Sequence, residues 1–286
     1  MSNDPYPNLP LVSIGIPVRN EAKFLEQTLA SLLAQDYTRT EFILSDNAST
    51  DGTREICERT AAMDVRVRVL STSVNEGAAA NFLRCLDAAR GEFFMWAGGH
   101  DLWSSNLVSQ CVEMLVRSPN AVIAVPESQW IDTASLPYGE RAGILDTRGM
   151  DPLARILTLL WANMHAVYGL IRTSSLRAAV PVPNYPGADL ILLSRLILTG
   201  DFIPASDALW SRRQTRTSES YDDRQRRYHS AEFRIRKPWL HLARLPFDLL
   251  KSVWSSDLRV SDKIAFTLAF PAQLPARYLV ARRRVA

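Results

Sequence analysis

Two side chains able to bind a metal ion stand side by side in the stretch FFMWAGGHDLW, residues 93–103. His100 and Asp101 follow two glycines, which follow five apolar residues that predict a buried strand. An imidazole and a carboxylate placed after a strand and a tight turn are suited to holding a divalent cation. The plain alternative is that the glycines only make the turn, that Asp101 caps a helix beginning near Ser104, and that His100 is a solvated loop residue.

The elements that must position this pair alternate between strands and helices. Strands are predicted at residues 11–18, 41–45, 65–70 and 93–97, with apolar residues at helical spacing between them. This alternation predicts a parallel, doubly wound α/β sheet with helices on both faces. Further strands are predicted at residues 121–126 and 166–172, helices at 151–161 and 188–200, and an edge strand at 201–210 that tolerates Pro204.

One rim of the predicted sheet carries polar side chains. The carboxyl ends of parallel strands share one edge of a sheet, and ligands bind in the crevice beyond that edge. The polar residues that follow the predicted strands there are Arg19, Asn20, Asp46, Asn47, Asn75, His100 and Asp101. The sequence therefore predicts a binding crevice at this rim.

Composition places the chain among globular proteins. It has 286 residues, 47% of them hydrophobic and 22% charged, which suits one or two domains with a full core. The three cysteines lack the spacing of a zinc or redox motif, which favours a reducing cytoplasm. No export signal is expected in the first ten residues, and no stretch reaches the roughly 18 apolar residues of a membrane span. The nearest stretch, residues 264–279, is interrupted by Pro271 and Pro275.

Charge is distributed unevenly along the chain. Residues 212–286 contain 17 Lys and Arg against 7 Asp and Glu, a net charge of +10, and residues 1–211 carry −7. Trp, Leu and Phe are mixed with basic residues between positions 234 and 254, which predicts a helix lying in a membrane interface near anionic lipid. The alternative is a helical hairpin packed on the rest of the chain, or a dimer interface. Nucleic acid is disfavoured as a partner because no binding motif accompanies the charge.

Several segments carry a resemblance to a known family. The first two predicted strands and their loops read VSIGIPVRNEAKFLEQTLASLLAQDY and FILSDNASTDGT. They are followed, in order, by NEGAAANFLRCLDAARGEFFMW, YGLIRTSSLR and GADLILLSRLILTGDF. In this order the segments resemble the family 2 glycosyltransferases of the GT-A fold, over about residues 10–213.

The resemblance implies an α/β fold of the GT-A type, with a doubly wound, mostly parallel sheet flanked by helices. Residues 10–215 would form the glycosyltransferase domain, and residues 216–286 a helical, basic C-terminal extension that acts as a membrane-surface or packing element. A nucleotide-sugar donor would bind in the crevice, and its sugar would pass to an acceptor hydroxyl with inversion.

The resemblance also assigns the donor-binding residues. Those near the donor's base and ribose would be Pro17, Arg19, Asn20, Glu21, Asp46 and Asn75. A carboxylate at a strand end, such as that of Asp46, can accept two donors from a nucleoside. The alternative is that residues 46–51 only cap a helix, through Ser49 or Thr50.

Members of the family usually carry an acidic pair where this chain has Gly98, Gly99, His100 and Asp101. That pair holds a divalent cation against the donor diphosphate, whose charge must be neutralised as the glycosidic bond breaks. With one acid left, we expect a weak site formed by His100, Asp101 and the donor phosphates, with Mn²⁺ favoured over Mg²⁺. Many members take a further histidine after an Arg-Arg pair; here Arg212 and Arg213 have none adjacent, and we expect them to contact the diphosphate directly.

Inversion needs a carboxylate that removes the proton of the acceptor hydroxyl. Asp189 matches the family's acidic position at the head of a helix, where the helix dipole would hold its pKa low; a plain N-cap aspartate is the alternative. Aromatic residues stack on sugar rings, and those expected near the acceptor, or else in the core, are Trp130, Trp161, His165 and Tyr168.

The expected function is an inverting hexosyl- or deoxyhexosyltransferase that moves a sugar from a nucleotide-diphosphate donor to a hydroxyl of a glycan or lipid-linked acceptor. We expect it to act in cell-surface polysaccharide synthesis, in the cytoplasm, with a peripheral position at the inner face of the membrane. The alternative is a non-catalytic sugar-nucleotide-binding or scaffold subunit that kept the fold after losing the acidic pair.

Overall fold

Four apolar runs form the parallel half of a single sheet. The structure is a computed structural model that describes residues 9–142, 145–181, 183–185, 187–215 and 239–283. These strands are β1 (Val12–Val18), β2 (Thr40–Asn47), β3 (Val67–Thr72) and β4 (Phe93–Trp96). β1 lies between β2 and β4, and β3 pairs with the free side of β2. Every residue of β2 and β4 is buried, as expected of strands that are covered on both faces.

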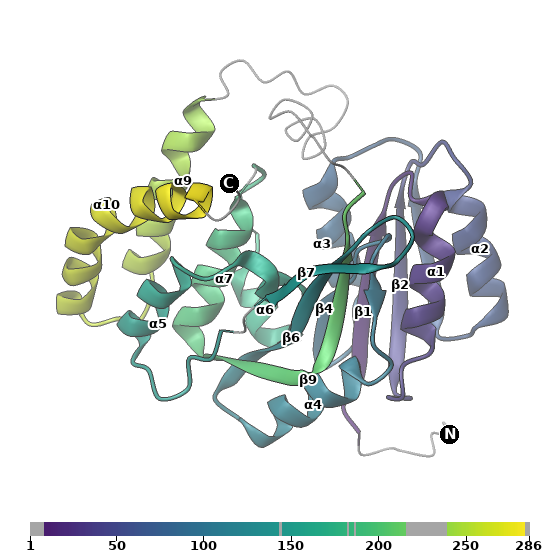
Figure 1. Cartoon of the computed structure of the whole chain (residues 1–286), viewed down its shortest axis with the longest axis horizontal. Coiled ribbons are helices and arrows are strands. Elements are labelled where there is room, and N and C mark those ends of the chain that lie inside the picture. Colours follow the sequence, from purple (N-terminus) through teal and green to yellow (C-terminus); the bar gives the residue numbers. More distant parts are fainter. Residues whose placement is uncertain (1–8, 143–144, 182, 186, 216–238, 284–286) are drawn as a thin grey trace.

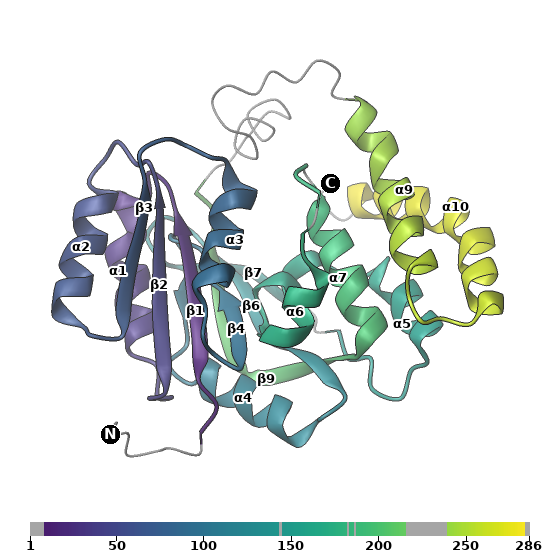
Figure 2. The same ribbon diagram turned by 180° about the vertical axis from the view of Figure 1, so that it is seen from behind.

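Helices cover both faces of this half (Figures 1 and 2). They are α1 (Ala22–Leu33), α2 (Thr53–Met63) and α3 (Ala78–Ala88). Leu25 and Leu29 of α1 pack in one hydrophobic core with Ile14 of β1. Cys85 and Leu86 of α3 pack in a second core on the other face of the sheet. The predicted doubly wound arrangement is therefore confirmed, with a mostly parallel sheet flanked by helices.

The second half of the sheet contains the antiparallel strands. β8 (Leu170–Arg172) pairs antiparallel with both β4 and β6 (Ala121–Ile131), while β6 and β9 (Asp201–Arg213) pair parallel. The remaining elements are β5 (Leu102–Trp103), α4 (Leu107–Arg117), β7 (Pro137–Ala142), α5 (Pro152–Leu159), the 3-10 helix η1 (Met164–Tyr168), α6 (Thr173–Ala179) and α7 (Ala188–Thr199). The resulting order is β3-β2-β1-β4-β8-β6-β9-β5, with β7 beside β6.

β9 is not the edge strand that the sequence predicts. It lies between β6 and β5 and is longer than expected. In the described part of the chain, β5 pairs with β9 only at Trp210 and Ser211, so no described strand lies on the side of Pro204 away from its partner Val125 of β6. A proline without a backbone N–H is tolerated where one side of the strand is open.

The C-terminal segment packs on the body of the protein through two helices, α9 (Trp239–Trp254) and α10 (Val260–Arg283). Leu245, Leu249 and Val253 of α9 are buried in the same core as α7, and the hydroxyl of Tyr185 donates to Asp248 Oδ2 at 2.7 Å. The C-terminal extension is therefore helical in its described part, and residues 216–238 and 284–286 of the predicted extension lie outside the described residues.

The prolines expected to interrupt residues 264–279 do not end the helix there, because α10 runs through both Pro271 and Pro275. Each proline removes one backbone donor, but the rest of the helix supplies its own bonds. Among the residues that the structure describes, we find no helix with the length and apolar content needed to cross a bilayer.

Candidate active site

The loops after β1 and β2 hold each other in place at the carboxyl end of the sheet. Thr50 N donates to Asn20 Oδ1 at 2.8 Å, and Asn20 N donates to Ser49 Oγ at 3.0 Å. Asn20 has a φ of 56°, a left-handed conformation that asparagine adopts more readily than most residues. These bonds bring Arg19, Asn20 and Glu21 beside the loop that follows Asp46.

Asp46 is almost fully buried at the end of β2, with 1% of its surface exposed. Its carboxylate accepts from the hydroxyl and the backbone N–H of Ser49. Ser49 and Thr50 do not cap the next helix, because α2 begins at Thr53 and has Gly52 as its N-cap; of residues 46–51, Asp51 accepts from Thr53 N at 3.0 Å. The turn is instead held by side chains that bond to nearby backbone groups.

Asn75 joins the same rim from the loop after β3. Its Oδ1 accepts from Asn47 Nδ2 at 2.8 Å and from Gly77 N at 3.0 Å, while Asn47 Oδ1 accepts from Glu76 N at 3.0 Å. The structure therefore gathers the residues expected near the donor base at one place; Pro17, which is part-buried, pairs with Ser45 near the carboxyl end of β1.

Asp101 is a buried anchor for β9. Its Oδ2 accepts from Trp210 Nε1 and its Oδ1 from Arg213 N, both at 2.9 Å. Burial raises the pKa of Asp101, an effect that His100 and these two donors oppose. The alternative of a helix cap is wrong: β5 follows Asp101, and α4 begins only at Leu107 with Asn106 as its N-cap.

A glycine is required opposite this carboxylate. A Cβ at Gly98 would lie 2.8 Å from Asp101 Oδ2, closer than side-chain carbons pack. The first glycine of the motif therefore makes room for the buried aspartate.

His100 lies between two carboxylates. Its Nδ1 is 3.1 Å from Glu21 Oε2, and its Nε2 is 3.9 Å from Asp101 Oδ1. A cation with bonds of about 2.1 Å could bridge the second pair, whose oxygen keeps a free lone pair. Among the residues that the structure describes, no three His, Cys, Asp or Glu side chains lie close enough together to bind one metal ion. The pair thus fits a cation that takes its remaining ligands from elsewhere.

Arg213 is committed to protein acceptors. Its guanidinium donates to His100 O at 2.8 Å, Asp132 O at 2.9 Å, Ser135 Oγ at 3.0 Å and Gln27 Oε1 at 3.2 Å. The side chain is 3% exposed. We therefore assign Arg213 to holding the loop that carries His100, rather than to an incoming ligand.

Arg212, in contrast, lies in an aromatic cage. Its guanidinium carbon is 4.1 Å from the centre of the Trp130 ring and 4.9 Å from that of Trp210. Such stacking holds the planar guanidinium in one orientation while it remains charged. Burial lowers the pKa of Arg212, and Asp101 opposes that shift.

His165 supports Arg212 from η1. Its Nε2 contacts Arg212 Nη1, and its Nδ1 lies 2.7 Å from Ser128 Oγ. Since a guanidinium only donates, Nε2 must accept, which leaves the proton on Nδ1. Burial and the nearby Arg212 lower the pKa of His165 to about 3, so this neutral form persists at physiological pH. The sequence predicts His165 near the acceptor, or else in the core, and does not indicate its contact with Arg212.

Asp189 lines a separate pocket of about 200 Å³ at the first turn of α7. The pocket walls are mostly apolar and include Phe82, Trp96 and Tyr168. Gly187, with a φ of 96°, is the N-cap of α7, so the alternative of an N-cap aspartate is wrong. The carboxylate of Asp189 has no hydrogen-bond partner among the described residues and faces the pocket instead.

The expected low pKa of Asp189 is corrected by the structure. Burial raises its pKa, and no donor or cation in the described part of the chain opposes the shift. Loss of water around the carboxylate disfavours its charged form. A carboxylate with a raised pKa is a stronger base once it is ionised.

Tyr168 connects this pocket to Asp101. Its ring lines the pocket and packs against Trp210 with centroids 4.5 Å apart, and Trp210 in turn donates to Asp101. Asp189, Arg212 and Asp101 therefore surround one aromatic cluster. Trp161 is not part of it, because its Nε1 donates to Gln273 of α10 at 3.3 Å. Trp210 is the residue that sequence reasoning missed, since its role depends on strand pairing.

Comparison with known proteins relates this chain to glycosyltransferases. The glycosyl transferase family 2 model matches residues 13–176. The putative teichuronic acid biosynthesis glycosyltransferase TuaG of Bacillus subtilis is 32% identical over 107 residues, which are 37% of this chain and 42% of that protein. The putative colanic acid biosynthesis glycosyl transferase WcaA of Escherichia coli is 31% identical over 102 residues, 36% of this chain and 37% of that protein. The match to such curated relatives thus spans less than half of their length.

Solved structures show the same fold. Staphylococcus aureus TarS 1–349 in complex with UDP-GlcNAc has a TM-score of 0.66 and 17% sequence identity, over 88% of this chain and 69% of that chain. The complex of the same protein with UDP has a TM-score of 0.64 and 16% identity. The family model covers more than half of this chain, and the fold agrees with it: the chain belongs to glycosyl transferase family 2.

Proposed function

We propose that the protein is an inverting glycosyltransferase that moves a hexose or deoxyhexose from a nucleoside-diphosphate donor to a hydroxyl of a glycan or lipid-linked acceptor. The observation that carries the proposal is the Asp189 carboxylate, which has no hydrogen-bond partner among the described residues and faces a pocket lined by Tyr168, whose ring packs on Trp210. Relatives named for teichuronic and colanic acid biosynthesis support a place in cell-surface polysaccharide synthesis. The TarS complexes with UDP and UDP-GlcNAc support a nucleotide sugar as the donor.

The donor's nucleoside would lie over the loops after β1, β2 and β3. Arg19 and Asn20 are exposed there, Asp46 places its carboxylate at the end of β2, and Asn75, whose Oδ1 accepts from Asn47 and Gly77, lies in the loop after β3. We assign these residues, with Pro17 and Glu21, to binding the base and ribose; the carboxylates of Asp46 and Glu21 are the groups that can accept from imide and hydroxyl groups.

The diphosphate would lie between His100 and Arg212. Glycosyltransferases of this fold typically use a divalent cation, and when bound it neutralises charge on the leaving diphosphate. His100 Nε2 and Asp101 Oδ1 would hold it, with Mn²⁺ favoured over Mg²⁺ because one ligand is an imidazole. Arg212 would add a fixed positive charge, held in place by Trp130 and His165.

Asp189 would accept the proton of the acceptor hydroxyl as its oxygen attacks the anomeric carbon opposite the diphosphate. The bond from that carbon to the diphosphate oxygen breaks, and both electrons leave with the diphosphate. Apolar walls around Asp189 raise its pKa, which brings it nearer to the working pH expected of a general base.

The metal assignment predicts a response to the type of cation. Isothermal titration of a nucleoside diphosphate should show tighter binding with Mn²⁺ than with Mg²⁺, and weaker binding with chelator. In His100→Ala, the increase in nucleoside-diphosphate affinity caused by Mn²⁺ should be at least about tenfold smaller than in the parent, since even an indirect metal contact often contributes that much. His100 is a suitable site because it is partly exposed, whereas Asp101 also anchors β9. Equal affinity under all these conditions would remove the cation from the proposal and leave Arg212 as the counter-charge.

We also propose that the C-terminal helices contact an anionic membrane surface from the cytoplasmic side. The outer face of α9 alternates basic and aromatic residues at helical spacing: Arg244, Phe247, Lys251 and Trp254. Val260, Ile264 and Leu268 of α10 are exposed at a spacing of four, and Trp254 Nε1 donates to Thr267 between them. We call these seven residues the outer stripe. Mixed apolar and basic side chains on one surface suit the headgroup region of an anionic bilayer.

Two substitutions on the outer stripe test this contact. Phe247 and Leu268 are 66% and 77% exposed, so Phe247→Ser with Leu268→Ser should leave the fold intact. The double variant should bind anionic vesicles at least about tenfold more weakly in sedimentation assays, because each apolar side chain contributes roughly 1.5–3 kcal/mol on leaving water. Met63→Ser, which removes a side chain 73% exposed on α2, is the matched control. If both variants bind vesicles equally, the C-terminal helices serve only for packing.

A further inference from the structure

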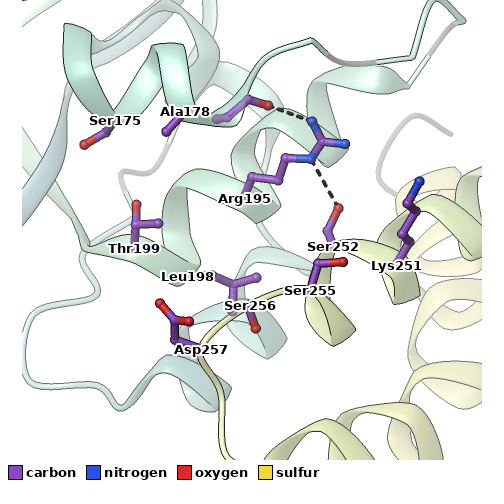
Figure 3. A pocket seen from close by; sticks show the side chains of 11 residues that line it. Ser175, Ala178, Arg195, Leu198, Thr199, Lys251, Ser252, Ser255, Ser256 and Asp257 are labelled. Carbon is purple, nitrogen blue, oxygen red and sulfur yellow. Dashed lines mark hydrogen bonds between the residues drawn. The ribbon is translucent and has the colours of Figure 1, made fainter.

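A second cavity, of about 530 Å³, lies between α6, α7 and the end of α9 (Figure 3). Thr199 lines it at the last turn of α7, whereas Asp189 lies at the first turn of the same helix. Ten residues of helix separate the two positions by about 15 Å. The cavity is therefore distinct from the pocket of Asp189, and its volume lies in the range of small-molecule sites.

One end of the cavity is positively charged. Arg195 Nη1 donates to Ala179 O and to Pro181 O, both at 2.7 Å, and Arg195 Nε donates to Ser252 Oγ at 3.4 Å. These bonds fix the guanidinium and leave Nη2 without an acceptor in the described part of the chain. Lys251 adds a second cation that has no ion pair with any described residue. Two cations at one end suit the oxygens of a phosphate.

The other end of the cavity is negatively charged. Figure 3 shows Asp257 at the opposite end from the Arg195 guanidinium and Lys251, with Ser255 and Ser256 between them. Asp257 forms no ion pair with the residues that the structure describes. A carboxylate in this position opposes a simple anion but favours an ammonium group.

We propose that this cavity binds a group that carries both a phosphate and an ammonium, of which phosphoethanolamine is the smallest form. The phosphate lies at Arg195 and Lys251, and the ammonium lies at Asp257. Lys251 also belongs to the outer stripe, so the cavity opens beside the face that we propose to contact the membrane. A lipid headgroup and a free metabolite share this chemistry. The link to the membrane rests on the proposed function, whereas binding of the soluble compound does not.

Binding of soluble phosphoethanolamine to the full chain tests the assignment. In amide NMR titrations, phosphoethanolamine should shift the resonances of residues 252–257 and bind more tightly than inorganic phosphate or ethanolamine alone. Asp257→Asn should remove the preference over phosphate, because the ammonium loses its partner. Lys251→Ala should weaken both phosphate compounds about fivefold, the effect of one lost charge contact. Arg259→Ala removes an exposed cation outside the cavity and serves as the matched control.

Vesicles separate the two sources of the ligand. If the source is a headgroup, phosphatidylethanolamine in phosphatidylcholine vesicles should bind the parent protein more strongly than it binds Asp257→Asn. If only the free compound binds, the site serves a metabolite, and the proposed cavity still stands. Equal binding of phosphate and phosphoethanolamine, or unchanged binding in both Lys251→Ala and Asp257→Asn, would overturn the proposal. Neither result depends on transferase activity, so failure here leaves the proposed function untouched.

Discussion

Asp189→Asn is expected to lower kcat for sugar transfer by about 10²- to 10⁴-fold, the usual contribution of a positioned general base. Asparagine keeps the size of the side chain but cannot accept the proton of the acceptor hydroxyl. Because the carboxylate has no protein partner in the described structure, the substitution removes no internal bond. Affinity for the nucleoside diphosphate should stay within about twofold of the parent, since Asp189 is not asked to contact the nucleotide.

The matched control is Asp207→Asn, which changes an exposed aspartate on β9 and should leave turnover unchanged. The dependence of kcat/KM on pH gives a second measurement. A base must be ionised to act, so activity should fall as pH drops through the pKa of Asp189. Burial raises that pKa, and the acidic limb should therefore lie above the range of an ordinary aspartate, near 3.9. Comparable turnover in Asp189→Asn and the parent would remove Asp189 from the mechanism.

Arg212→Ala should lower kcat/KM by roughly 10²- to 10³-fold, the effect of removing one fixed group that stabilises developing charge. The aromatic cage of Trp130 and Trp210 holds a planar guanidinium, so Arg212→Lys should recover only part of the activity. His165→Ala should have a smaller effect of the same kind, because His165 positions Arg212 rather than contacting the donor.

Steady-state kinetics and nucleotide titration together distinguish these roles. Arg212→Ala should weaken nucleoside-diphosphate binding, whereas Asp189→Asn should not. Arg117→Ala is the control, since it removes an exposed arginine on α4 that pairs only with Glu113 in the described structure. If Arg212→Ala keeps full affinity and turnover, the diphosphate charge must be balanced elsewhere.

Much of the fold follows from local sequence patterns. The apolar runs of β1, β2 and β4 predict strands covered on both faces, and the helical stripes between them predict which residues pack on the sheet. The positions of β5 and β9 in the sheet do not follow from local patterns, because they depend on pairing between residues about a hundred positions apart. The sequence around Ser104 favours a helix, but Trp103 pairs with Trp210 before α4 can begin.

The sequence predicts which polar residues lie at one rim of the sheet, but it does not predict their contacts. Strand ends predict where Asp46, Asn75 and Asp101 lie, because parallel strands share one edge. They do not predict that Asp101 anchors Trp210, that Arg213 bonds to backbone carbonyls, or that burial raises the pKa of Asp189. Each of these depends on which residues exclude water from a side chain, and that information lies in the tertiary packing.

The most direct measurement of the central proposal is proton NMR of slow donor hydrolysis across a panel of nucleotide sugars, with water as the acceptor. Displacement with a base opposite the leaving diphosphate predicts that the first free sugar has the inverted anomeric configuration. The signal should be lost in Asp189→Asn and retained in Asp207→Asn. A first product that keeps the anomeric configuration of the donor would contradict the inverting mechanism. Tight donor binding without hydrolysis or transfer for any sugar would instead indicate a non-catalytic subunit.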